Sequence, residues 1–304
     1  MTDWHTGTIV RWHSLTASLA TFQLAPAPGL AFPPYKGGQH IALRRDHCRL
    51  TRAVTESNGA IRYVPDVDEA GRQKFGAITH SYSIASAPFE AAAHDRLEFY
   101  IVLETHLGAS GRLSSSLFEV PSGNDNTLSY VNRITGNFTL ADRTRGLRNI
   151  LMIGTGTGLA PFVSMLKQVD HESKSGAPHV RYTLLHANRT RRELGFHEEL
   201  LAIEAGGRFD FLYLPSVSRP AADDFDTPGL GRGRASNLLR SVFGMPIPEE
   251  VVEPVLPAHV NRDTLLERLS PDVTVALTCG SPAAVAEIQA IAAARRLRVE
   301  TEEW

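Results

Sequence analysis

A glycine-rich loop, Gly154-Thr155-Gly156-Thr157-Gly158, constrains the fold more than any other stretch of the sequence. It follows the apolar run 149–153, which is typical of a buried strand, and precedes residues 162–169, whose apolar spacing is helical. Pro161 suits the first turn of that helix, where a backbone N–H has no partner to lose. Glycines between a strand and a helix let backbone N–H groups approach a diphosphate, and the helix N-terminus favours negative charge. A strand-to-helix turn without a ligand would use the same residues.

The loop departs from two common phosphate-binding motifs. No Lys follows Gly158, which excludes the triphosphate-binding P-loop. Leu159 stands where the usual dinucleotide fingerprint has Gly or Ala. The interpretation of the loop therefore depends on the rest of the chain.

The two halves of the chain have different patterns. The first half holds short strand-like segments separated by turn residues, which predicts an antiparallel β-barrel. These segments are Thr8–Val10, Ser18–Leu24, His40–Leu43, Ile61–Val64, Ser81–Ala85 and Leu97–Leu103, with one short helix at Arg112–Phe118. In the second half, strands at 149–153, 182–186, 209–214 and 273–278 alternate with helices near 162–169, 196–205 and 282–296. This alternation predicts a parallel sheet covered by helices, a Rossmann-like α/β domain.

Two domains follow from this change of pattern. The expected domains are residues 1–145 and 146–304, and their boundary lies in the polar segment 142–146. The Pro-rich residues 243–260 are expected to form a long surface loop.

Composition excludes several classes of protein. The 304 residues are 42% hydrophobic and 21% charged, as in ordinary globular proteins. A net charge of −2 provides no bulk attraction to nucleic acid or membranes. The sequence shows neither a signal peptide nor an apolar run long enough to cross a membrane. Cys48 and Cys279 lie far apart, so we expect no metal centre and a reducing, cytoplasmic location.

The order of these features resembles the ferredoxin–NADP reductase family, in which an FAD-binding barrel precedes an NADP-binding α/β domain. The resemblance covers nearly the whole chain. By this resemblance, His80-Ser81-Tyr82-Ser83 stands at the family's flavin motif, Arg-x-Tyr-Ser. Tyr82 would pack on the isoalloxazine ring, and the Ser83 hydroxyl would reach the N5 edge of the flavin.

One position of that motif departs from the family. His80 stands where the family has Arg, a permanent cation whose planar fork suits the FAD pyrophosphate. The second flavin motif, Gly-x-x-Ser, matches Gly111-Arg112-Leu113-Ser114, and Arg112 is placed to supply the missing charge. Tyr100, Ile101 and Val102 correspond to the family's strand beside the flavin.

The resemblance also implies the NADP-binding residues of the second half. Thr155, Gly156, Thr157 and Gly158 would contact the diphosphate. Arg189, Ser218, Arg219 and Arg232 follow predicted strands and resemble the family's 2′-phosphate site. Ligands of open α/β sheets bind at the carboxyl ends of the strands, and arginines form charge-assisted bonds with phosphate.

Three residues near the carboxyl end complete the site that the resemblance implies. Cys279, in Cys-Gly-Ser-Pro, would lie near the nicotinamide. Glu302 matches an acidic position that helps proton transfer in plastid-type members, and Trp304 would cover the second face of the flavin, as in bacterial members that end in Trp. With Ser83, these three form the expected catalytic set.

The implied function is that of a monomeric enzyme, a ferredoxin/flavodoxin–NADP+ oxidoreductase. It would transfer a hydride between NADPH and FAD, and single electrons to or from a separate ferredoxin or flavodoxin. The alternatives are the NADH-linked reductase component of a multicomponent oxygenase, a non-catalytic flavin-binding subunit of a redox complex, and a flavin-free binding module. The run Arg44, Arg45, Arg49 and Arg52 would suit an acidic carrier, although we favour a solvated barrel face there.

Overall fold

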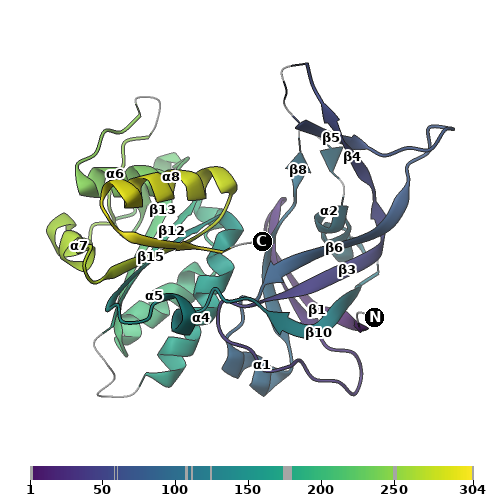
Figure 1. Cartoon of the computed structure of the whole chain (residues 1–304), viewed down its shortest axis with the longest axis horizontal. Helices are drawn as coiled ribbons and strands as arrows, with labels where there is room; N and C mark the ends of the chain where they lie inside the picture. The colour runs from purple at the N-terminus through teal and green to yellow at the C-terminus, as the bar shows by residue number, and fades with distance from the viewer. Residues whose placement is uncertain are drawn as a thin grey trace. The chain divides into compact units, whose positions relative to one another are not determined.

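The computed structural model describes residues 3–57, 59, 61–106, 109–110, 112–123, 125–173, 180–248 and 252–302. The chain forms two compact units, each built around its own sheet (Figure 1). The first unit comprises Met1–Tyr35, His40–Ile84 and Glu90–Thr135, and the second comprises Lys36–Gln39, Ala85–Phe89 and Gly136–Trp304. In the described part of the chain, no helix is both long and apolar enough to cross a membrane.

The first unit is an antiparallel six-stranded sheet in the order β6-β3-β10-β1-β2-β7. Its strands are β1 (Trp4–Thr16), β2 (Leu19–Ala25), β3 (His40–Arg49), β6 (Phe75–Ser83), β7 (Leu97–Val102) and β10 (Thr127–Thr135). Two small hairpins, β4–β5 (Thr51–Thr55, Ile61–Pro65) and β8–β9 (Thr105–His106, Ala109–Ser110), and the helices α1 (Pro88–His94), α2 (Arg112–Phe118) and η1 (Val120–Ser122) complete its elements. Alternate residues of the strands, such as Phe22, Ile41 and Phe99, form one apolar core.

The second unit is a parallel six-stranded sheet in the order β14-β13-β12-β11-β15-β16. Its strands are β11 (Asn149–Thr155), β12 (Arg181–Asn188), β13 (Asp210–Val217), β14 (Gly231–Arg232), β15 (Thr274–Cys279) and β16 (Arg298–Thr301). Its helices are α3 (Leu140–Arg143), η2 (Gly156–Leu159), α4 (Ala160–Glu172), η3 (Arg191–Glu193), α5 (His197–Gly206), η4 (Ala222–Asp226), α6 (Ala235–Phe243), α7 (Arg262–Arg268) and α8 (Pro282–Ala294). Helices α6 and α8 cover one face of the sheet and α4 and α5 the other (Figure 1). The predicted fold class, an antiparallel barrel-like domain followed by a Rossmann-like α/β domain, is confirmed.

Two short segments from the first half of the chain belong to the second unit. Gly38 has a left-handed φ of +96°, and a side chain there would collide with the carbonyl oxygen of Phe138. Ser164 of α4 donates its hydroxyl hydrogen bond to the carbonyl oxygen of Ser86 at 2.7 Å. The ring of Phe89 stacks on His171 with 3.9 Å between the ring centroids. Helix α4 is therefore packed by residues that lie far before it in the sequence.

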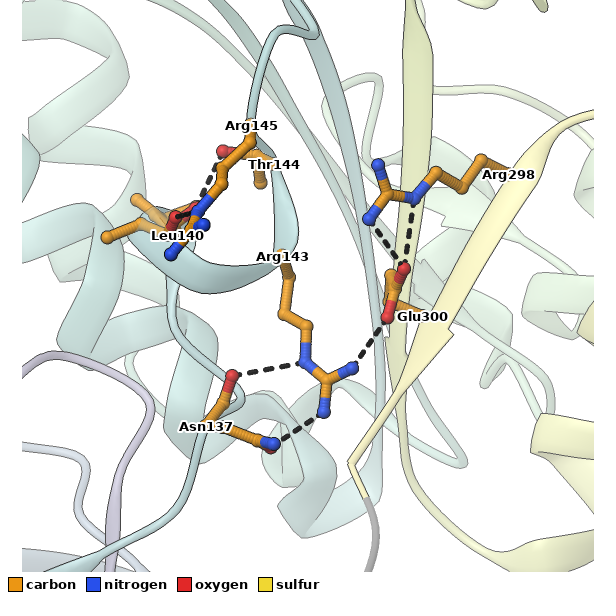
Figure 2. Close-up of polar contacts among 8 residues, drawn as sticks. Asn137, Leu140, Arg143, Thr144, Arg145, Arg298 and Glu300 are labelled. Atoms are coloured by element: carbon orange, nitrogen blue, oxygen red, sulfur yellow. Dashed lines mark hydrogen bonds and ion pairs between the residues drawn. The ribbon is translucent and has the colours of Figure 1, made fainter.

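The segment between the two sheets also belongs to the second unit. Arg143 of α3 forms an ion pair with Glu300 of β16 at 2.8 Å and donates to the backbone and side-chain oxygens of Asn137 (Figure 2). Arg298 donates to the other carboxylate oxygen of Glu300 at 2.9 Å. The compact units therefore divide before α3, between residues 135 and 136, whereas the sequence places the domain boundary at 145/146.

The described residues of the Pro-rich stretch after α6 form an irregular segment that carries one β-bridge. Its described residues begin at the end of α6, and Val255 exchanges two backbone hydrogen bonds with Arg232, at 2.8 and 2.9 Å. This antiparallel bridge covers the outer edge of β14, and Ala258 N–H donates to the carbonyl of Pro228 at 2.7 Å. The stretch thus protects an edge strand that would otherwise present unpaired backbone groups.

Candidate functional site

The predicted flavin motif lies on β6, at one edge of the first sheet. His80 and Tyr82 are two residues apart, so their side chains point to the same face of the strand. The Tyr82 ring meets Phe99 edge-on with 6.5 Å between centroids, and burial raises the pKa of its hydroxyl. Ser83 is buried and pairs with His40 of β3. Ser81 faces the other side and is exposed.

The His80 side chain carries an unusual buried atom. Its Nε2 is buried and has no hydrogen-bond partner among the described residues. Burial lowers the pKa of His80, and the positive charge of Arg112 lowers it further, while Glu104 opposes the change. The imidazole is therefore neutral near neutral pH and has one nitrogen without a partner. Because buried polar atoms without a hydrogen bond are rare, this atom fits a site that binds a polar group.

Helix α2 brings the second flavin motif beside the first. Arg112 has a left-handed φ of +74°, and its guanidinium carbon lies 5.5 Å from the centroid of the Tyr63 ring. The buried Ser114 accepts a hydrogen bond from the backbone N–H of Glu104 at 3.1 Å, which ties α2 to the segment after β7. Leu113 is fully buried, and Gly111 lies outside the described residues.

The third set of predicted flavin residues lies on β7, at the other edge of the sheet. Ile101 is part of the apolar core of the first unit. Tyr100, which points to the opposite face, is also buried, whereas Val102 is exposed. Of these three residues, Ile101 therefore has a core role whether or not a flavin binds.

The glycine-rich loop lies at the carboxyl end of β11 and continues as η2 into α4. Gly156 has a left-handed φ of +58°, and a side chain there would meet only Asn188, at 4.0 Å. A side chain at Gly158 would instead collide with the backbone of Cys279 and Gly280. Gly158 therefore allows η2 to pack on the end of β15, while the backbone at Gly156 faces open space, as a phosphate-binding loop requires.

Arg189 is held by a buried carboxylate. Its guanidinium donates to both oxygens of Glu193, from Nη2 at 2.6 Å and from Nε at 3.2 Å. The backbone N–H groups of Arg189 and Thr190 donate to the same carboxylate. Glu193 is only 6% exposed, so its charge requires this compensation. The positive charge of Arg189 is therefore already paired within the loop.

Arg219 and Arg232 differ from Arg189 in this respect. Within the described ranges, neither forms an ion pair. The backbone N–H of Arg219 donates to the carbonyl of Arg189 at 2.7 Å, which joins the loops after β12 and β13, and Ser218 next to it donates to Asn188. Arg232 lies over the ring of Phe225 with 4.7 Å to the centroid, and this ring is 57% exposed. The guanidinium groups of Arg219 and Arg232 could therefore bind an anion at the carboxyl edge of the sheet.

Cys279 and Glu302 form a partly buried hydrogen bond. The Cys279 thiol donates to a carboxylate oxygen of Glu302 at 3.0 Å. Burial raises the pKa of Cys279 well above its usual value, and the adjacent negative charge of Glu302 raises it further. The sulfur therefore remains a neutral thiol. Trp304 lies outside the described residues.

Comparisons with known proteins agree with this geometry. A family model described as the oxidoreductase NAD-binding domain matches residues 152–232. Ferredoxin–NADP reductase A of Sorangium cellulosum is 29% identical over 225 residues, which span 72% of this chain and 67% of that protein. The ferredoxin–NADP reductase of Azotobacter vinelandii is 26% identical over 217 residues, 69% of each chain. A solved ferredoxin–NADP+ reductase from Neisseria gonorrhoeae, with bound FAD and NADP, covers 99% of both chains with a TM-score of 0.62 and 19% identity.

These matches confirm the resemblance to ferredoxin–NADP reductases that the sequence predicts. The chain is thus an oxidoreductase, the class of enzyme that the sequence predicts. The fold of this family also occurs in reductases with other partners: the cytochrome b5 reductase domain of Ulva prolifera nitrate reductase has a TM-score of 0.62 at 14% identity. The fold alone therefore does not identify an electron carrier for this chain.

Several residues of the site were not found by sequence reasoning. Tyr63, Glu104 and Phe225 contact or influence predicted site residues, and no local motif marks them. Glu193 could have been found, because Thr190-x-x-Glu193 has the spacing of a capping box, which the structure contains. The described residues contain no group of His, Cys, Asp or Glu that could hold a metal ion.

Three arginines of the run, those on β3, form contacts within the first unit, whereas Arg52 on β4 is exposed. Arg44 pairs with Asp46 at 2.6 Å, and Arg49 pairs with Glu119 at 3.5 Å. Arg45 donates to the backbone carbonyls of Thr127, Ser116 and Asp125. These contacts favour a solvated barrel face over a docking site for an acidic carrier.

Proposed function

We propose that this chain is an FAD-dependent reductase that transfers a hydride between NADPH and the flavin, and single electrons to or from a separate ferredoxin or flavodoxin. The observation that carries the proposal is the pair of uncompensated arginines, Arg219 and Arg232, at the carboxyl edge of the sheet in which β11 leads into the open backbone at Gly156. A 2′-phosphate is the part of NADPH that such cations would recognise. The relatives named ferredoxin–NADP reductase support the choice of carrier class.

The residues of the first unit fit FAD. Bound FAD would supply the redox chemistry, because it accepts a hydride and releases electrons one at a time. Tyr82 would offer an aromatic face to the planar ring, and the Ser83 hydroxyl would offer one hydrogen bond at its edge. Arg112 would supply positive charge for the diphosphate, and the unpaired Nε2 of His80 would gain a partner.

The second unit would hold NADPH at the carboxyl edge of its sheet. The backbone N–H groups of 155–158 would face the diphosphate, and Arg219 and Arg232 would bind the 2′-phosphate. Arg189 would contribute shape more than charge, because Glu193 occupies its guanidinium. Cys279 would hold its proton next to the nicotinamide, since Glu302 accepts that hydrogen bond and keeps the thiol neutral.

Two variants and a matched control test the use of the 2′-phosphate. Arg219→Ala and Arg232→Ala should each weaken NADPH binding by about 1.5–3 kcal/mol per lost charged hydrogen bond, and leave NADH binding nearly unchanged. Arg148→Ala removes an exposed arginine at the amino end of β11, and should change neither nucleotide. The measurement is the KM for both nucleotides with an artificial electron acceptor. Equal losses for NADPH and NADH would instead favour an NADH-linked oxygenase reductase.

A flavin assay tests the remaining part of the proposal. Flavin released by heating should be FAD by chromatography, because two predicted motifs for a diphosphate lie in the first unit. A colourless protein, or recovered FMN, would contradict the proposal.

A further inference from the structure

We infer that Tyr63, on the β4–β5 hairpin, is the positioning residue for Arg112, and that this pair, rather than β6, presents the fixed positive charge to the diphosphate of FAD. The inference rests on the proposed function, because it assumes that the first unit binds FAD. It names one residue, Tyr63, that no motif of the sequence marks.

Strand β6 contains no Arg or Lys, so it offers no permanent positive charge. The family's arginine is replaced by His80, which is neutral near neutral pH because burial and the Arg112 charge both disfavour the imidazolium. The charged groups that act on His80 are Arg112 from α2 and Glu104 from the segment after β7. A neutral imidazole can share one hydrogen bond through Nε2, but it adds no charge to match a diphosphate.

Arg112 is a permanent cation on α2, the helix that packs against β6 and β3. The positive charge of Arg112 disfavours protonated His80 and partly offsets the rise in the pKa of Tyr82, so it acts on both residues of the predicted flavin motif. Glu104 and Cys48 are the other groups that act on Tyr82. Arg112 also holds a left-handed φ of +74°, a conformation that is strained for a residue other than glycine. Such a conformation persists only where the surrounding structure holds it, and it is frequent at ligand sites.

The ring of Tyr63 contacts the Arg112 guanidinium. The guanidinium carbon lies 5.5 Å from the centroid of the Tyr63 ring, within the range of a cation–π contact. Tyr63 is half-buried, whereas its neighbour Arg62 faces solvent and pairs with Glu56 at 3.3 Å. Strand β5 also lies against β9, which leads into α2. The hairpin therefore supports both the backbone before Arg112 and its side chain.

Titration of apoprotein with FAD, followed by quenching of flavin fluorescence, tests this assignment. Arg112→Gln should raise the Kd for FAD by about 10-fold to 100-fold, the range for a lost charged hydrogen bond. Tyr63→Leu should raise it about 3-fold to 10-fold, and Tyr63→Phe, which keeps the ring, should restore it. The double variant Tyr63→Leu/Arg112→Gln should bind FAD no more weakly than Arg112→Gln alone, because both changes remove the same interaction. Arg62→Ala is the matched control on the same hairpin and should leave the Kd unchanged.

The dependence of the wild-type Kd on pH separates the two candidate cations. The Kd should stay constant from about pH 5.5 to about pH 8, because Arg112 remains charged throughout. A Kd that rises with pH in this range would assign the charge to His80 and overturn the inference, as would equal Kd values for Tyr63→Leu and Arg62→Ala. If Tyr63→Leu does not fold, Arg112→Lys tests the same contact, because it keeps the charge but loses the planar group. Wild-type protein that binds no FAD would instead refute the proposed function.

Discussion

The buried histidine of the second sheet should make the protein sensitive to acid. His186 on β12 is fully buried, and its Nδ1 shares a hydrogen bond with the Tyr213 hydroxyl at 2.9 Å. The same hydroxyl lies 3.0 Å from Nδ1 of His197 on α5. Burial, with the nearby His197 acting in the same direction, lowers the pKa of His186 from 6.5 to about 3.

The direction of the effect follows from proton uptake. Between the folded and unfolded pKa values the unfolded chain binds a proton at this residue and the folded chain does not, so stability falls as pH falls. For a shift from 6.5 to about 3, the loss between pH 7 and pH 5 is about 2 kcal/mol from this one group. His186→Asn, which keeps a polar group near the position of Nδ1, should remove this part of the loss.

Urea unfolding followed by circular dichroism, at about pH 5, 6, 7 and 8 with one fixed FAD concentration, measures this difference. The quantity to compare is the change in unfolding free energy between pH 7 and pH 5 within each protein. His13→Asn, at an exposed histidine of β1, is the matched control and should behave as wild type. If His186→Asn loses as much stability on acidification as wild type, the buried imidazole is not the group that takes up the proton.

Two further predictions concern ion pairs of the second unit. Arg189→Ala should weaken NADPH and NADH binding by similar factors, because Glu193 already pairs with the Arg189 guanidinium. This result would differ from that of Arg219→Ala. A larger change in the KM for NADPH than in the KM for NADH would show that Arg189 binds the 2′-phosphate. A double-mutant cycle of Arg143→Met and Glu300→Gln should give a coupling energy of about 1–2 kcal/mol, between the values for exposed and buried pairs. Thermal unfolding measures it, and a coupling near zero would mean that the pair does not hold β16.

The sequence predicts the fold best where a strand carries its own signal. Strand β11 is a continuous apolar run between clear boundaries, as central parallel strands are. Strand β10 was not predicted, because Thr127–Thr135 is mostly polar and only Leu128 and Tyr130 are buried. Its place between β1 and β3 depends on those neighbours and not on its own composition. The short β14 likewise exists only between β13 and Val255.

The sequence also predicts some features of the candidate site better than others. Motifs such as 154–158 are local, so spacing alone identifies them. The partners that set the charge of a site residue come from outside its motif: Tyr63 approaches Arg112 from a hairpin, and Glu302 approaches Cys279 from 23 residues later in the chain. No single-sequence pattern connects such pairs, because their spacing is set by tertiary packing. The sequence therefore predicts which residues belong to the site, but not which of their charges are already neutralised.

The second unit includes segments 36–39 and 85–89 from the first half of the chain. This limits where related genes could recombine to exchange domains. A gene fusion that joined the barrel of one relative to residues 136–304 of this chain would separate α4 from Ser86 and Phe89, its partners in the first half. The hybrid would have to supply the carbonyl that Ser164 uses and the ring that stacks on His171 from a foreign sequence. Recombination between such genes should therefore give a folded protein when the segments 36–39 and 85–89 come from the same parent gene as the carboxyl half. A single crossover at residue 136 should produce a nucleotide-binding half that folds with a damaged α4.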